Sequence, residues 1–205
     1  KPFIFDADNG GRIEHLPYTV NSMERQGVSA IVIEDKIGFK RNSLFKNQKS
    51  TKQDSIKNFC KKIKTIKNSR KSEDFLIIAR IESFILGKGL HDALNRAYGY
   101  SKAGADAILI HSKESTPNQI FSFSRIFRKS KYYKPMIAVP SSYSKTYEKD
   151  LLKNGFSVVI YANHLLRASY MIMKKTALDI LRFNRSHETE KNIVSVKDIL
   201  NIKPE

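Results

Sequence analysis

Six short runs of apolar residues recur along the chain, and they constrain its fold more than any other feature. Each run is almost continuous in Ile, Val, Leu or Phe, which is typical of strands that are buried on both faces. Strands of this kind form a parallel sheet that is covered by helices. The runs are FIFDAD (3–8), AIVIED (30–35), FLIIARIE (75–82), AILIHS (107–112), MIAVPS (136–141) and VVIYAN (158–163).

The segments between the runs predict the helices. Residues 53–67 have apolar side chains at spacings of three and four, which places them on one face of a helix. These side chains are Ile56, Phe59, Ile63 and Ile66. Residues 90–102 and 165–181 show the same pattern, and Pro117 suits the first position of a further helix. Strand and helix alternate six times without a long break, so we expect one α/β domain over 1–205, with 165–205 as its carboxyl-terminal helical region.

Polar residues follow the apolar run at the same end of every predicted strand. In a βα barrel that end carries the active site, and an open doubly wound sheet would bind its ligand there too. A (β/α)8 TIM-type barrel typically takes about 250 residues, whereas this chain has 205 residues and six predicted units. Two readings follow: an open sheet, or a barrel that lacks its first two βα units.

The chain is strongly basic, with 37 Lys and Arg against 20 Asp and Glu, a net charge of +17. Such a charge suggests nucleic acid or an anionic surface as a partner. The lysines between residues 55 and 72, however, mostly lie opposite the apolar face of a predicted helix, as a solvated surface would. No helix-turn-helix, zinc-finger or RRM pattern is visible, so we expect no specific nucleic-acid partner.

Other classes are disfavoured by simple counts. No run approaches the roughly 18 apolar residues of a membrane span, and residues 1–11 do not resemble a signal peptide. Cys60 is the one cysteine, which excludes a disulfide framework and fits a reducing compartment, the cytoplasm.

Three carboxylates are predicted to meet at neighbouring strand ends. Asp6 and Asp8 alternate onto one face, and Glu34 ends the next strand. Close carboxylates repel unless a cation neutralises them, and oxygen ligands without His or Cys favour Mg²⁺ or Mn²⁺. The alternative is a set of surface ion pairs with Lys. Asp35 faces the opposite way, so we interpret it as structural.

A cationic group follows on the next two strands. Arg80 offers a fork of donors that suits a phosphate or carboxylate, and Glu82, on the same face, can orient it or join the outer shell of a metal. His111 could donate to the same anion, or it could be an ordinary buried histidine. The polar segment 35–44, which contains Gly38, could close over a ligand or be a basic surface loop.

These residues resemble the phosphoenolpyruvate mutase branch of the isocitrate lyase superfamily. The resemblance covers essentially the whole chain, and EDK-x3-K-x-NSL followed by ARIES and IHSK is its most specific part. The matching motifs are DADNGG (6–11), GVSAIVIEDKIGFKRNSL (27–44), FLIIARIES (75–83), ALNRAYGYSKAGADAILIHSK (93–113), PMIAVPSSYS (135–144), VVIYANHLLRAS (158–169) and IVSVKDIL (193–200).

The resemblance implies an α/β barrel that assembles as a dimer or tetramer with a swapped carboxyl-terminal helix. It implies a Mg²⁺ site with Asp6 as direct ligand and with Asp8 and Glu34 acting through water. Residues Lys40, Asn42 and Ser43 would lie on a gating loop. By the same resemblance, Asn42, Arg80 and His111 hold the transferring phosphoryl group, and Glu82 supports substrate binding.

The family reaction interconverts phosphoenolpyruvate and phosphonopyruvate, which forms the C–P bond at the entry to phosphonate biosynthesis. Asn42 favours a mutase over the related phosphonopyruvate hydrolases, and the absence of a KKCGH-like motif disfavours a carbon–carbon lyase. One departure stands out: the family begins with two further βα units, which this sequence does not contain. The sequence therefore resembles a partial chain, and an inactive fragment that binds anions or nucleic acid is the non-enzymatic alternative.

Overall fold

The computed structural model describes residues 1–38 and 52–202. The chain divides into two compact units, Lys1–Ile160 and Tyr161–Glu205. The first unit is built on a six-stranded sheet in the order β1-β2-β5-β6-β7-β8, in which every pair of neighbours is parallel. Its strands are β1 (Ile4–Asp6), β2 (Ala30–Glu34), β5 (Leu76–Ile81), β6 (Ala107–Ile110), β7 (Met136–Ala138) and β8 (Phe156–Val159).

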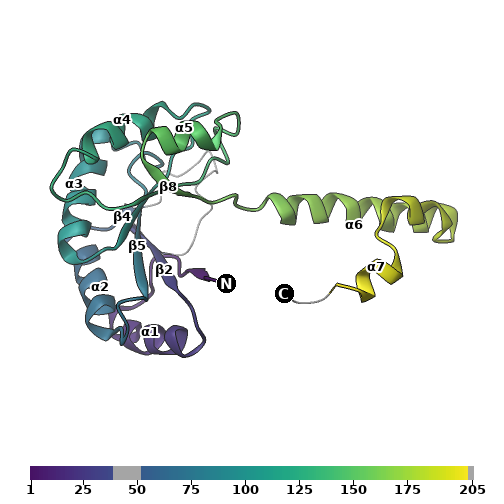
Figure 1. The fold of residues 1–205 in the computed structure, drawn as a ribbon, viewed down its shortest axis with the longest axis horizontal. Coiled ribbons are helices and arrows are strands. Elements are labelled where there is room, and N and C mark those ends of the chain that lie inside the picture. Colours follow the sequence, from purple (N-terminus) through teal and green to yellow (C-terminus); the bar gives the residue numbers. More distant parts are fainter. Residues whose placement is uncertain (39–51, 203–205) are drawn as a thin grey trace. The chain divides into compact units, whose positions relative to one another are not determined.

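Helices follow the strands and lie in an arc along the outer side of the sheet (Figure 1). They are the short 3-10 turn η1 (Ile13–His15) and α1 (Leu16–Arg25), α2 (Ile56–Ser69), α3 (Gly89–Ala103), α4 (Asn118–Phe127) and α5 (Glu148–Lys153). The mixed α/β class is confirmed: the strands form half of a TIM-type barrel. Helix α2 begins at Ile56 because the side chain of Ser55 accepts a hydrogen bond from the backbone N–H of Asn58 at 3.1 Å.

The strands differ in burial according to their place in the sheet. All residues of β2, β6 and β7 are buried, as predicted for strands that are covered on both sides. The prediction is wrong for β1, whose three residues are all exposed. In the part of the chain that the structure describes, β1 pairs only with β2 and β8 only with β7, so these two edges lack a neighbour that would cover them.

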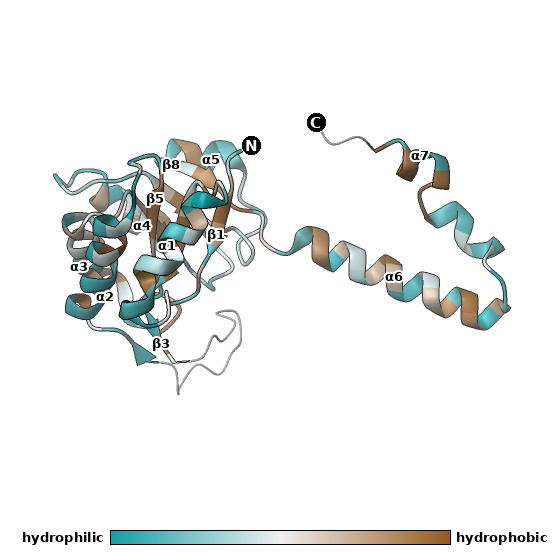
Figure 2. Cartoon of the chain, turned by 90° about the horizontal axis from the view of Figure 1, so that it is seen from below, coloured by the Kyte–Doolittle hydropathy of each residue, from teal (hydrophilic) through white to brown (hydrophobic). Residues whose placement is uncertain are grey.

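The hydrophobic core lies between the sheet and the arc of helices, where Figure 2 shows apolar residues on the strands and on the inward faces of the helices. Phe59 of α2 and Tyr100 of α3 are fully buried, with ring centroids 4.6 Å apart. On α4, Phe123 stacks on Phe127 at 5.3 Å. The Phe59–Tyr100 contact joins α2 to α3, and Tyr98 joins α3 to α4 through Phe127, with ring centroids 6.1 Å apart.

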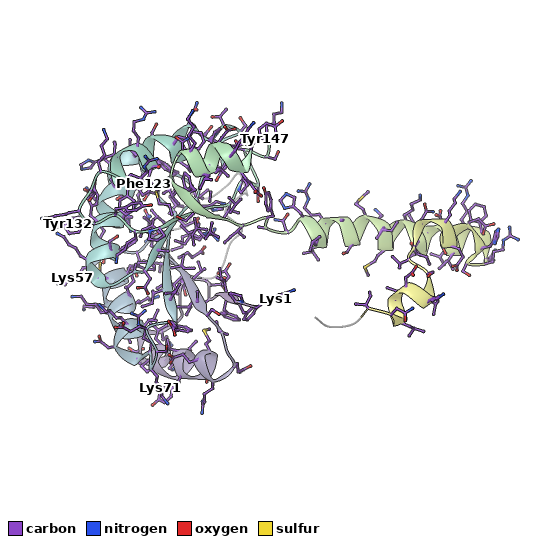
Figure 3. The ribbon with its side chains drawn as sticks, viewed as in Figure 1. Lys1, Lys57, Lys71, Phe123, Tyr132 and Tyr147 are labelled. Atoms are coloured by element: carbon purple, nitrogen blue, oxygen red, sulfur yellow. The ribbon has the colours of Figure 1, made fainter. Side chains whose placement is uncertain are left out.

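The lysine-rich helix α2 is mostly a solvated surface, as predicted. Figure 3 shows Lys57 and, after the helix, Lys71 projecting away from the unit. Two cations depart from that prediction. The ammonium of Lys62 donates to the carbonyl of Asn9 at 2.6 Å, and Arg70 donates to the carbonyl of Phe75 at 2.8 Å. These side chains tie α2 to segments at opposite ends of the sheet.

A small antiparallel pair, which the sequence did not predict, follows β2. It consists of β3 (Lys36–Ile37) and β4 (Lys52–Gln53), with Lys36 opposite Gln53 and Ile37 opposite Lys52. Strands of two residues are too short to leave a periodic pattern in the sequence. The pair fixes the chain on both sides of residues 39–51.

The second unit contains α6 (His164–Phe183), the 3-10 turn η2 (His187–Asn192) and α7 (Val196–Leu200). The helix predicted at 165–181 is confirmed. No side chain of α6 is buried, and large apolar residues are exposed on it, including Leu165 at 85% and Leu181 at 74%. No helix among residues 1–38 and 52–202 has both the length and the apolar character to cross a membrane.

Candidate active site

The site is built where the carboxyl ends of β1, β2, β5 and β6 meet. Parallel pairing sets Glu34 directly opposite Arg80 on the neighbouring strand. The backbone N–H of Glu34 donates to the carbonyl of Asp8 at 2.6 Å, which joins the acidic segment after β1 to the end of β2. The predicted acidic and cationic groups are therefore parts of one site.

Four charged side chains form a closed ring of ion pairs at this point. Lys36 lies between two carboxylates, with its ammonium 3.3 Å from Glu34 Oε1 and 3.3 Å from Glu82 Oε2. Arg80 closes the other side, with Nε 2.6 Å from Glu82 Oε1 and Nη2 3.4 Å from Glu34 Oε2. We call Glu34, Lys36, Arg80 and Glu82 the charge ring; its formal charge is zero.

Lys36 is the member of the charge ring that the sequence analysis missed as a functional residue. A lysine just after a strand is usually solvated, but Lys36 is only 5% exposed. Its position inside the EDK motif was the available signal. Both carboxylates of the ring need a cation on each side because charges buried without partners are very costly.

His111, at the end of β6, packs against the ring. Its Nδ1 lies 3.0 Å from Arg80 Nη2 and 3.2 Å from Glu82 Oε1. The two predicted readings of His111 therefore coincide, since it is buried and it also contacts the proposed anion-binding arginine.

Burial and neighbouring charges shift the pKa values of His111, Glu34, Glu82 and Arg80. Burial lowers the pKa of His111, with the positive charge of Arg80 adding to the effect, so the imidazole is neutral at pH 7. Burial raises the pKa of Glu34 despite the nearby Arg80. Burial also acts on Glu82, but the contacts from His111, Arg80 and Lys36 outweigh it and lower its pKa. Burial disfavours charge on Arg80 as well, yet Glu82 and Glu34 keep its pKa above the ordinary value.

Asp6 and Asp8 lie beside the ring rather than in it. Asp6 Oδ1 accepts a hydrogen bond from the backbone N–H of Asp8 at 3.0 Å, and the charge of Asp6 contributes to the raised pKa of Arg80. Asp8 has a left-handed backbone with φ of 53°, so it leaves the strand in a tight turn. Asp6 therefore lies close enough to Arg80 for its charge to act on the arginine, and Asp8 follows it in the turn.

The donor set can be tested against a magnesium ion. Among residues 1–38 and 52–202, no three His, Cys, Asp or Glu side chains are grouped as a ready metal site. Both oxygens of Glu34 face cations of the ring, so of the three carboxylates predicted for the metal only Asp6 and Asp8 lie outside the ring. Mg²⁺ is commonly held by one or two carboxylates together with water and substrate oxygens, and Asp6 and Asp8 fit that pattern.

Two further groups of predicted residues have different outcomes. Lys40, Asn42 and Ser43 lie outside the described residues. Asp35 is fully buried, and its carboxylate accepts hydrogen bonds from α3, which agrees with its structural interpretation.

A parallel α/β half-barrel with charged residues gathered at the carboxyl ends of its strands belongs to the class of TIM-barrel-type proteins, whose active sites lie there. Comparison with known proteins identifies the branch of that class. The family described as phosphoenolpyruvate phosphomutase matches residues 1–181. The phosphoenolpyruvate phosphomutase of Tetrahymena pyriformis is 35% identical over 205 residues, which covers 100% of this chain and 67% of that protein.

Solved structures agree. The crystal structure of phosphoenolpyruvate phosphomutase from Streptomyces platensis subsp. rosaceus matches with a TM-score of 0.91 and 33% identity, over 98% of this chain and 68% of that one. A phosphonopyruvate hydrolase solved with oxalate and Mg²⁺ matches with a TM-score of 0.85 and 34% identity, over 97% of this chain and 67% of that one. The chain belongs to the phosphoenolpyruvate phosphomutase family, in the isocitrate lyase superfamily, and it spans about two thirds of the length of these relatives.

Proposed function

We propose that the protein interconverts phosphoenolpyruvate and phosphonopyruvate and so serves phosphonate biosynthesis. The observation that supports this proposal is the contact between Arg80 and His111 at the carboxyl ends of the strands. Glu82 holds Arg80 in place, and the turn that contains Asp6 and Asp8 lies at the same end of the sheet. An arginine fork whose orientation is fixed by carboxylates suits a phosphoryl group that changes its position.

In this reaction the O–P bond of phosphoenolpyruvate breaks and a bond forms between the same phosphorus and the methylene carbon of the pyruvate enolate. Atoms and charge balance within one substrate, so no water and no second substrate enters. A phosphoryl group in transfer needs positioning and charge stabilisation more than it needs a covalent partner. The rate therefore depends on donors that are already in place.

The residues of the site divide this work. Arg80 binds the phosphoryl oxygens, and Glu82 and Glu34 keep its guanidinium in one orientation. His111, neutral because its pKa is lowered, adds a hydrogen-bonding ring without adding charge. Asp6 and Asp8 would hold Mg²⁺, which would supply positive charge to stabilise the negative charge that develops during the transfer.

A phosphonopyruvate hydrolase is the second candidate, because a hydrolase structure matches about as well as the mutases do. The two reactions differ in whether water reaches the phosphorus. The sequence position that favours the mutase is Asn42, which by resemblance holds the transferring group. Its side chain lies outside the described residues.

The test gives phosphonopyruvate and Mg²⁺ to the purified full-length protein and follows all products. Formation of phosphoenolpyruvate, lost in Asn42→Ala, is the expected result. Release of pyruvate and phosphate would assign the hydrolase instead. Cleavage of a 2-hydroxy or 2-oxo dicarboxylic acid without phosphonopyruvate turnover would assign a carbon–carbon lyase.

We also propose that the protein is a homo-oligomer, dimer or tetramer, in which a second copy covers α6. The exposed apolar side chains of α6 and α7 support this, since patches of this kind rarely face water in a monomer. Leu165→Lys together with Leu181→Lys is expected to shift the species in sedimentation toward the monomer. The single Cys60 supports a reducing compartment, the cytoplasm.

A further inference from the structure

Behind the charge ring, the buried carboxylate of Asp35 gathers hydrogen bonds from several elements. It accepts from Gln53 Nε2 of β4 at 2.9 Å and from the phenol of Tyr100 on α3 at 2.7 Å. It also accepts from the backbone N–H of Glu82 at 3.0 Å, while its own carbonyl accepts from the N–H of Asp54 at 2.8 Å. One fully buried acid thus joins the ends of β2, β4 and β5.

Arg96 of α3 holds that acid in place, and its side chain is only 5% exposed. Its Nη1 donates to Asp35 Oδ2 at 3.1 Å and to the carbonyl of Asp54 at 2.8 Å, and it lies 2.9 Å from the Tyr100 oxygen. Its Nε donates to Asp92 at 2.8 Å. A single guanidinium nitrogen, Nη1, therefore contacts both the acid and the backbone that follows β4, while Nε pairs with Asp92.

Two members of the charge ring are attached directly to this network. Lys36 follows Asp35 in the chain, and its strand β3 pairs with β4. Glu82 is bound through its own backbone N–H. A displacement of Asp35 would move both. Glu82 contacts Arg80 directly, and Lys36 contacts Glu34, the other carboxylate that orients Arg80.

We propose that Arg96 is a positioning residue of the active site: acting through Asp35, it sets where Lys36 and Glu82 stand and so pre-organises the charge ring for phosphoryl transfer. The inference rests on the proposed function for its chemistry, and on the hydrogen bonds of Asp35 for its geometry. Misplacement of a reacting group by about 1 Å can cost on the order of a hundredfold in rate.

The chain offers a matched control at the other end of β5. Arg70 is also nearly buried, bonds to a carbonyl and pairs with Asp106 at 2.7 Å, but its contacts reach only the amino ends of β5 and β6. Arg96→Lys and Arg70→Lys each keep the charge and lose the fork. Tyr100→Phe, which removes one donor to Asp35 and keeps the ring packing, is a gentler variant that tests the same network.

Two readouts are taken on folded full-length protein: amide hydrogen exchange, and kcat with KM for phosphonopyruvate. In Arg96→Lys we expect faster exchange at Glu82 and Asp54, and a kcat lowered about 10- to 100-fold with KM within about threefold. Arg70→Lys should instead speed exchange at Ile77, whose N–H bonds to Asp106, and leave kcat unchanged. Tyr100→Phe should also speed exchange at the amides of Glu82 and Asp54 and lower kcat, each by a smaller factor than Arg96→Lys.

Unchanged exchange at Glu82 in Arg96→Lys would overturn the proposal. Faster exchange with unchanged kcat would also overturn it, because Arg96 would then be structural only. If the wild type does not turn over phosphonopyruvate, the proposed function fails, and exchange at Glu82 alone decides whether Arg96 positions the ring.

Discussion

The two ends of strand β5 use charge in different ways. At the amino end, Arg70 pairs with one acid, Asp106, which is 26% exposed at its side chain, and with the carbonyl of Phe75. At the carboxyl end, Arg80 and Glu82 join two further buried charges and a histidine, and Glu82 is fully buried. At the amino end, Arg70 therefore holds the end of α2 to the segment that precedes β5.

A buried cluster of the kind at the carboxyl end can contribute little net stability, since the free-energy cost of removing charges from water can exceed the gain from pairing them. Proteins keep such clusters where function requires them. On the proposed function, the amino end of the sheet serves stability and the carboxyl end serves activity.

The largest expected effect is a loss of kcat on removal of Arg80 at the carboxyl end, compared with removal of Arg70 at the amino end. Arg80→Met should lower kcat by about 10²–10³-fold, as the loss of a charge-stabilising donor does in other enzymes. Arg70→Met should leave kcat unchanged and lower the free energy of unfolding. Initial rates with phosphonopyruvate and urea denaturation measure both. Equal losses of kcat in the two variants would remove the distinction between the ends.

Removal of Lys36 tests whether the charge ring depends on its buried lysine. Lys36→Met leaves Glu34 and Glu82 buried with one cation between them, so the free energy of unfolding should fall by about 3–5 kcal/mol. Adding Glu82→Gln should restore part of that loss, because the second carboxylate no longer needs neutralising. A double-mutant cycle in urea measures the coupling, and additive losses would show that Lys36 does not bridge the acids.

A smaller loss of unfolding free energy is expected in the loops that lead from a helix into the amino end of the next strand. Gly104 ends α3 with φ of 111°, and a Cβ there would lie 2.5 Å from the side chain of Lys67. Gly104→Ala should therefore cost about 1–2 kcal/mol of unfolding free energy, with no change in kcat. Gly27→Ala is the control, since its φ of 76° is also positive but its Cβ would meet nothing within 4 Å. Its loss, from backbone strain alone, should be smaller.

The smallest effect is a pH dependence from His111. Because burial lowers its pKa, the unfolded chain binds this proton below the ordinary value of 6.5 while the folded chain does not. The contribution of His111 to stability is therefore present above pH 6.5 and is lost as the pH falls. Glu34, whose pKa is raised, acts in the opposite direction, so the comparison of wild type with His111→Gln isolates the histidine. A steeper loss on acidification in the variant would contradict the assignment.

The fold was predictable because its strands are buried between helices, and burial leaves continuous apolar runs. The same logic failed at β1, where exposure depends on the absence of a covering neighbour and not on the residues of the strand. The site residues were predicted from their positions at or just past the carboxyl ends of the strands; they are Asp6, Asp8, Glu34, Arg80, Glu82 and His111.

The charge ring itself was not predictable. It depends on the pairing of Glu34 with Arg80 across two strands and on a buried lysine, and neither is encoded in local spacing. Arg96 was hidden for the same reason: it lies 61 residues from Asp35 in the chain, on a helix whose pattern signals only amphipathicity.

Phosphorus-31 NMR of the turnover of phosphonopyruvate in oxygen-18 water, with Mg²⁺ and the full-length protein, tests the central claim most directly. If the carboxyl-end site transfers the phosphoryl group within one substrate, the phosphonate signal is replaced by that of phosphoenolpyruvate, and none of the three non-bridging oxygens on phosphorus comes from solvent. Inorganic phosphate that carries oxygen-18 would contradict the account, because water would then have reached the phosphorus.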